Sequence, residues 1–136
     1  MKDWILPACG ALLCWGVWGF IPKLTTRYLS PHSAIVYEVM GAVCLAVIAA
    51  ALLKFRVEVQ PIGIGLAMLT GTLGFLGAFC FLVAVSKGPV TLVSTLSALY
   101  PVVSIVLAVG LLHEPLSLRQ CLGIFLALIA MVLVAA

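Results

Sequence analysis

The sequence contains very few charged residues. Of 136 residues, seven are lysine or arginine and four are aspartate or glutamate, which is 8% of the chain. A soluble domain usually carries about a quarter charged residues. With 65% hydrophobic residues and a mean hydropathy of +1.36, so few charges cannot cover a globule in water. The composition excludes a soluble domain and predicts that lipid surrounds most of the protein.

The motifs of enzymes and nucleotide-binding proteins are also missing. There is no serine nucleophile elbow, phosphate loop or dinucleotide fingerprint. The basic residues are scattered rather than clustered, so nucleic acid is not an expected partner. The cysteines lie in apolar stretches without a CxxC pair, which favours packing over a disulfide or metal role; they are Cys9, Cys14, Cys44, Cys80 and Cys121. We therefore expect no enzyme, no cofactor and no metal site.

Five long apolar stretches make up nearly all of the chain. They predict helices over residues 4–21, 31–53, 61–86, 89–112 and 118–136. Each is apolar throughout, without the alternation of a transmembrane strand, and each approaches the roughly 20 residues that span a bilayer. The predicted fold is all-α: a polytopic membrane protein with five transmembrane helices in one domain, 1–136. An odd number of spans places the termini on opposite sides, as in half of a larger assembly.

Local signals mark where these helices begin and end. Pro22 indicates the exit of the first helix, and Ser30 can cap the second. Gly88 offers a left-handed residue at the end of the third. Ser117 and Gln120 have the spacing of a capping box at the start of the fifth.

Glu38 is the acidic residue that lies well inside a predicted span. A charge deep in a span costs about 2.5–3.5 kcal/mol, so such residues face the bundle or a watery cavity. One carboxylate that binds either a proton or a cationic substrate is what a proton-coupled carrier requires. The alternative is a glutamate that reaches the interface or pairs with Lys23 or Arg27.

Pro101 predicts an interruption near the middle of the fourth helix. It removes one backbone hydrogen bond and frees the carbonyl of Ser97. Transporters often bind substrate at interrupted helices, which makes the polar residues here candidates for substrate contact; they are Ser94, Ser97 and Tyr100. The alternative is a simple kink.

Aromatic residues complete the set of candidate substrate contacts. Trp15 and Trp18 are three residues apart and share a face of the first helix, and Tyr37 precedes Glu38. Aromatic faces can hold cations or flat apolar molecules. Packing between helices is the competing interpretation.

The second half of the chain carries an ordered set of motifs. In residues 96–123, LSALYPVVSIVLAVGLLHEPLSLRQCLG, a proline is followed by a dozen apolar residues, a glutamate, Leu-Ser, a glutamine and a glycine. Earlier come Trp15-Gly16 and Ser30-Pro31. With these motifs the chain resembles one EamA-type repeat of the drug/metabolite transporter superfamily. The resemblance implies a secondary carrier that exports metabolites or drugs, with a small-molecule substrate whose identity it leaves open.

Two departures from this family affect the expected function. Members usually carry two such repeats, whereas this chain has one, so we expect a homodimer, parallel or antiparallel, or a paralogous partner in the cell's inner membrane. Members often have an arginine where this chain has Glu38, which favours handling of a cation or a proton. A non-transporting membrane subunit and a lipid-linked sugar flippase component are the alternative functions.

The basic residues give little preference for one orientation in the bilayer. With five spans, one side would hold four of them and the other three. The first group is Lys2, Lys54, Arg56 and Arg119, and the second is Lys23, Arg27 and Lys87. The sequence therefore predicts that the chain can insert both ways up.

Overall fold

A computed structural model describes residues 3–135, with side chains to residue 133. Every regular element in this range is an α-helix, so the predicted all-helical class is confirmed. Lys2 and Ala136, which the predictions included, lie outside the described residues. The helices group into two compact units, residues 1–87 and 88–136. A single domain over 1–136 stays a prediction.

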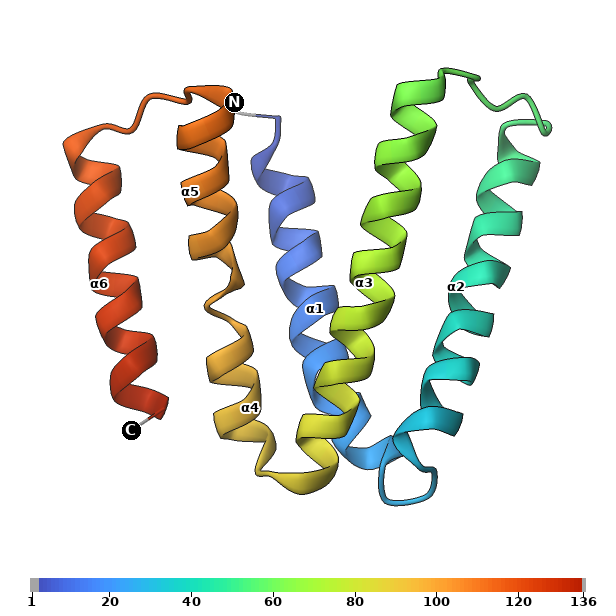
Figure 1. The fold of residues 1–136 in the computed structure, drawn as a ribbon, viewed down its shortest axis with the longest axis horizontal. Helices are drawn as coiled ribbons and strands as arrows, with labels where there is room; N and C mark the ends of the chain where they lie inside the picture. The colour runs from blue at the N-terminus through green and yellow to red at the C-terminus, as the bar shows by residue number, and fades with distance from the viewer. Residues whose placement is uncertain (1–2, 136) are drawn as a thin grey trace. The chain divides into compact units, whose positions relative to one another are not determined.

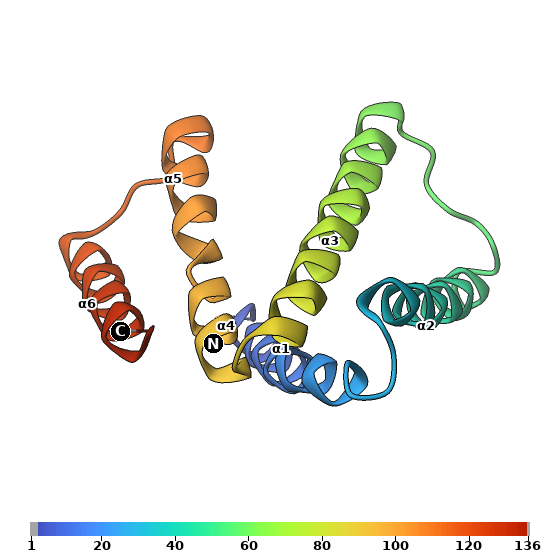
Figure 2. The same cartoon turned by 60° about the horizontal axis from the view of Figure 1, so that its bottom comes forward.

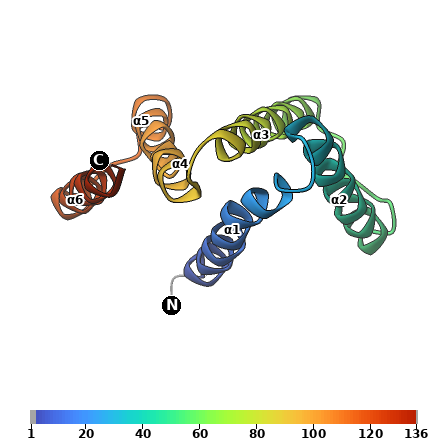
Figure 3. The same ribbon diagram turned by 90° about the horizontal axis from the view of Figure 1, so that it is seen from below.

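The first unit contains three helices. They are α1 (Ile5–Thr25), α2 (Pro31–Leu52) and α3 (Pro61–Lys87), and α3 packs against both of the others (Figure 1). Figure 3 views this unit from the end at which α1 and α3 finish and α2 begins. A small core of Ala34, Ile35 and Leu82 joins α2 to α3 near this end. Most other apolar side chains of the unit are exposed, as expected for helices that face lipid.

Helix α1 continues past Pro22 to Thr25, whereas the sequence indicated an exit at Pro22. A proline removes only its own N–H donor, and here the hydrogen-bond ladder resumes at once. The Thr26 backbone N–H donates to the Pro22 carbonyl over 2.9 Å. In a bilayer, unpaired backbone is costly, which favours continuing a helix beyond a proline. Pro22 is itself buried, so its ring packs inside the unit.

Two predicted helix starts are confirmed. The Ser30 side chain accepts a hydrogen bond from the Ser33 backbone N–H, with Pro31 at the first position of α2. Ahead of α6 (Leu118–Ala135), the Ser117 N–H donates to the Gln120 side-chain oxygen over 2.8 Å. The Gln120 N–H donates in turn to the Ser117 hydroxyl over 3.3 Å. These bonds satisfy backbone donors that the helices leave unpaired.

The prediction of a left-handed conformation at Gly88 is wrong. No glycine in the described range has a positive φ. Pro89 supplies the reason, because a residue before proline is pushed toward extended conformations. A left-handed residue instead follows α5 (Tyr100–Leu112), where His113 has φ 54° and ψ 34°.

The second unit contains α4 (Val90–Ser97), α5 and α6, and α4 packs against α6 (Figure 2). The helix predicted over 89–112 is therefore two helices separated by Ala98 and Leu99. A tight turn connects them: the Leu99 N–H donates to Leu96 and the Val102 N–H to Leu99. Pro101 lies in the first turn of α5, where a missing N–H costs no helical bond.

Four segments are long and apolar enough to cross a membrane. They are Ile5–Thr25, Pro31–Leu52, Pro61–Lys87 and Val90–Leu112, the last of which includes the α4–α5 break. Helix α6 is a shorter apolar helix of 18 residues, about 27 Å long, against a hydrocarbon core of about 30 Å. A multi-pass membrane protein follows from these lengths, and a fifth span at α6 is consistent with them.

Candidate functional site

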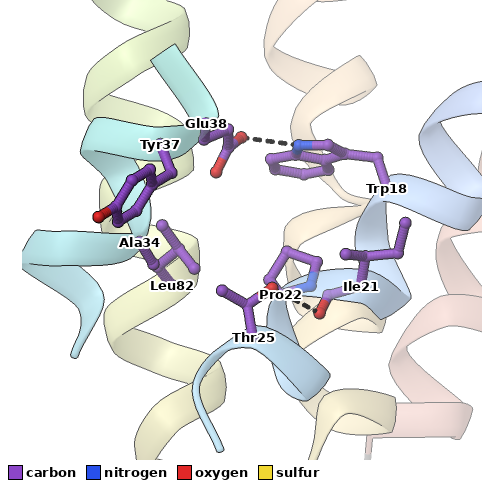
Figure 4. A pocket seen from close by; sticks show the side chains of 8 residues that line it. All are labelled: Trp18, Ile21, Pro22, Thr25, Ala34, Tyr37, Glu38 and Leu82. Carbon is purple, nitrogen blue, oxygen red and sulfur yellow. Dashed lines mark hydrogen bonds between the residues drawn. The ribbon is translucent and has the colours of Figure 1, made fainter. Parts of the chain in front are cut away.

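A cavity of about 230 Å³ lies in the first unit, beside the small core. The second half of α1, the first turns of α2 and one residue of α3 enclose it (Figure 4). Its lining is mostly apolar and consists of Trp18, Ile21, Pro22, Thr25, Ala34, Tyr37, Glu38 and Leu82. Three of the residues that the sequence proposed for substrate contact, Trp18, Tyr37 and Glu38, are therefore brought together.

Glu38 and Trp18 are joined by a hydrogen bond across the cavity. The indole Nε1–H of Trp18 donates to Oε1 of Glu38 over 2.8 Å, linking α1 to α2 (Figure 4). The Trp18 ring also packs on Phe81 of α3, with ring centroids 5.2 Å apart and planes tilted by 35°. Phe81 is buried, so all three helices of the unit help to fix this pair.

The alternative in which Glu38 pairs with Lys23 or Arg27 is not seen among the described residues. The Lys23 amine donates to the Val85 carbonyl of α3 over 2.7 Å. Within residues 3–135, Glu38 has Trp18 as its side-chain partner and forms no ion pair with Lys23 or Arg27. The carboxylate therefore keeps one oxygen, Oε2, without a partner from the described chain.

The other polar groups around the cavity are engaged or point elsewhere. The Thr25 hydroxyl donates to the Ile21 carbonyl over 3.2 Å. The Tyr37 hydroxyl points away from the Glu38 carboxylate (Figure 4). The polar group that the cavity offers to a ligand is thus the negatively charged Glu38 carboxylate.

Trp15 is not part of this cavity. It is 61% exposed, compared with 37% for Trp18. Residues three apart on a helix differ by about 60° around its axis, since each residue turns it by about 100°. The two indoles therefore point in different directions around α1, and only Trp18 reaches Glu38.

The other lining residues, which the sequence did not single out as candidate contacts, are Ile21, Pro22, Thr25, Ala34 and Leu82. Pro22 and Thr25 were missed because of a helix boundary. Both lie in the last turn of α1, which the sequence placed outside the helix. The signal that could have found them is helical spacing, because Trp18, Pro22 and Thr25 recur at intervals of four and three.

The candidates in the second unit have different surroundings. Pro101 lines an apolar groove of about 80 Å³ between the α4–α5 segment and α6. The groove's lining is Ala98, Pro101, Val102, Ile105, Ile124, Ala127, Leu128 and Met131. This lining contains no polar side chain and does not include Ser94, Ser97 or Tyr100. The groove is therefore explained by packing between helices.

No metal-binding group is evident in the described part of the chain. Nowhere in it do three histidine, cysteine, aspartate or glutamate side chains lie close enough together to hold an ion.

Comparison with known proteins gives one match. The sequence model of the EamA-like transporter family matches residues 2–136, and so covers both units. No curated protein and no solved structure matches the chain.

Proposed function

The chain belongs to the EamA-like transporter family, and on that premise we propose that it is a secondary carrier exporting small metabolites or drugs. Its membrane would be the cell's inner membrane. The observation that supports this most directly is Glu38, a carboxylate without a basic partner in a cavity between three membrane-length helices. Family membership supplies the activity class, and the cavity supplies the site.

Glu38 is the proposed coupling residue. A charge at membrane depth costs about 2.5–3.5 kcal/mol, and no ion pair of Glu38 within the described residues offsets that cost. A proton or a cationic substrate would offset it. If the proton and the substrate compete for this carboxylate, binding of either one releases the other. Alternating access of the cavity to the two sides then couples their movements in opposite directions.

The carrier is proposed to work as a dimer. Members of this family usually have two repeats, and residues 2–136 match the family model as one. In the first unit, α1 and α2 bury only Pro22, Ala34 and Ile35, which leaves long apolar faces for lipid or a partner. A second copy, parallel or antiparallel, would supply a second repeat; a paralogue is the other proposed partner.

The remaining candidate contacts stay proposals for the transport path. Trp15 lies on α1, one turn before Trp18. Pro101 and the polar residues near the α4–α5 break could contact a substrate as it moves; they are Ser94, Ser97 and Tyr100.

Proton flux in liposomes that contain only this protein tests the coupling role. The panel of solutes would include amines, amino acids and quaternary ammonium dyes. Glu38→Gln keeps the shape of the side chain and the acceptor for Trp18, but it cannot carry the charge. We expect substrate-dependent proton flux in the native protein and only the background of empty liposomes in the variant.

The matched controls are Glu58→Gln and Glu114→Gln, because both glutamates lie outside the helices. Their flux should equal that of the native protein. Undiminished flux in the Glu38 variant would refute coupling through this residue. Absence of any transport by the protein alone would favour the non-transporting subunit.

A further inference from the structure

We propose that the Glu38 cavity binds a small organic cation whose charged group is a protonated amine, and that Trp18 positions the carboxylate for it. This names the substrate class of the proposed carrier and takes its biological meaning from that proposed function. The binding itself can be measured without transport.

The hydrogen-bonding groups of the cavity favour a ligand that donates hydrogen bonds. Two of its donors are engaged within the chain: the Trp18 indole with Glu38, and the Thr25 hydroxyl with the Ile21 carbonyl. The third, the Tyr37 hydroxyl, points away from the Glu38 carboxylate (Figure 4). What is left is the second oxygen of the Glu38 carboxylate, Oε2. A ligand made only of acceptors would find no donor beside Oε2, whereas an ammonium group carries N–H donors for this oxygen.

The charge of the cavity selects a cation. Glu38 is the charged residue in its lining, and the nearby Lys23 amine is bonded to the Val85 carbonyl. An anionic ligand would meet a carboxylate in surroundings of low polarity, where like charges repel more strongly than in water. A protonated amine there forms a charge-assisted hydrogen bond, which is roughly twice as strong as a neutral one.

Trp18 is a positioning residue in this arrangement. Its N–H holds Oε1 of Glu38, so the carboxylate cannot rotate freely and Oε2 stays available. The buried Phe81 ring supports the indole from α3. The indole also offers an aromatic surface beside the carboxylate, which favours a cation with an apolar body.

The size of the cavity limits the ligand. Its volume of about 230 Å³ is below the roughly 300–1,000 Å³ of sites for drug-sized molecules. A single ring or a short alkyl chain attached to the amine fits this limit better than a large dye.

Isothermal titration calorimetry on the unmodified protein in lipid nanodiscs tests the proposal. The four probes are benzylamine, benzyltrimethylammonium, benzyl alcohol and benzoate, which share a ring but differ in charge and donors. Titrations into empty nanodiscs correct for partitioning into lipid. We expect saturable binding of benzylamine, weaker binding of benzyltrimethylammonium, and none of the other two. Equal binding of benzyl alcohol, or any saturable binding of benzoate, would overturn the proposal.

Two variants locate the binding. Glu38→Gln should weaken benzylamine binding by about tenfold or more, the loss expected for one charge-assisted bond, while Glu114→Gln should leave it unchanged. Trp18→Phe should weaken benzylamine binding several-fold and reduce the ratio of the affinity for benzylamine to that for benzyltrimethylammonium. Trp4→Phe should change neither quantity. Unchanged affinity in Glu38→Gln would refute the site. The probe comparison uses one protein, so it decides the ligand class even where a variant fails to fold.

The result is separable from the proposed function. Specific amine binding without transport by the protein alone would leave this inference standing and refute the carrier. Proton-coupled transport of a neutral or anionic solute, without amine binding, would support the proposed carrier and refute this inference.

Discussion

At the scale of single residues, Lys23 has a role that its sequence position does not suggest. Its amine donates to the carbonyl of Val85, in the last turn of α3. The last four carbonyls of a helix have no donor within it, and a positive charge there is favourable because of the helix dipole. Lys23 of α1 thus caps α3 and ties the two helices together next to the Trp18–Phe81 contact.

Replacement of Lys23 should destabilise the first unit. Lys23→Met keeps much of the side-chain length but removes the donor, so the Val85 carbonyl loses a charged partner. We expect the free energy of unfolding to fall by about 1.5–3 kcal/mol, the range for hydrogen bonds to charged groups. Equilibrium unfolding in mixed micelles, followed by circular dichroism, measures this.

Arg27→Met is the matched control for that experiment. Arg27 lies just beyond the same helix and is exposed, so its loss should change the free energy of unfolding by no more than about 0.5 kcal/mol. Equal effects of the two substitutions would contradict the capping role of Lys23.

At the scale of elements, helix starts and helix ends differ in how well the sequence specifies them. Starts at Ser30 and at Ser117 with Gln120 depend on side chains bonding backbone within three residues. Ends depend on backbone conformation: Gly88 does not adopt the left-handed form, and His113 does. For a residue with a Cβ, that conformation costs roughly 1–2 kcal/mol.

Substitution at His113 should therefore stabilise the end of α5. His113→Gly removes the Cβ clash of the left-handed conformation, and we expect the thermal unfolding midpoint to rise, with a gain of about 1 kcal/mol. His113→Ala keeps the Cβ and should give no such gain. A larger gain for alanine than for glycine would show that the histidine ring, and not the backbone, is the source of the strain.

At the scale of the whole molecule, exposed apolar surface is the dominant property. Within the most apolar 18 residues of each candidate span, the buried share is 17% for the most buried span and zero for the least buried. In water this would be untenable, but in lipid those side chains are solvated, and association depends on close packing instead. The proposed second copy would pack against the same exposed apolar faces.

Tagging both termini with reporters tests whether this copy can be antiparallel. Four basic residues against three give almost no preference for one orientation, so we expect each tag to be detected on both sides of the membrane. Two extra lysines in the loop that holds Lys54 and Arg56 should shift the population to one orientation. A single orientation in the native protein would instead require a parallel copy or a different protein as partner.

The sequence by itself determined the helical class, the membrane environment, the capped starts of α2 and α6, and the position of Glu38 inside a span. These features depend on hydropathy and on contacts between residues a few positions apart, which the order of the residues already contains. Their physical basis is local, so no knowledge of the tertiary structure was needed to predict them.

Only the tertiary structure decided which side chains meet. It selected Trp18 rather than Trp15 as the partner of Glu38, twenty positions away, and the carbonyl of Val85, sixty-two positions away, for Lys23. It also carried α1 past Pro22, so that Pro22 and Thr25 line the cavity. Such pairings follow from the way three helices pack, because packing fixes how each helix is rotated about its axis, and the periodicity of nearly uniform apolar stretches does not.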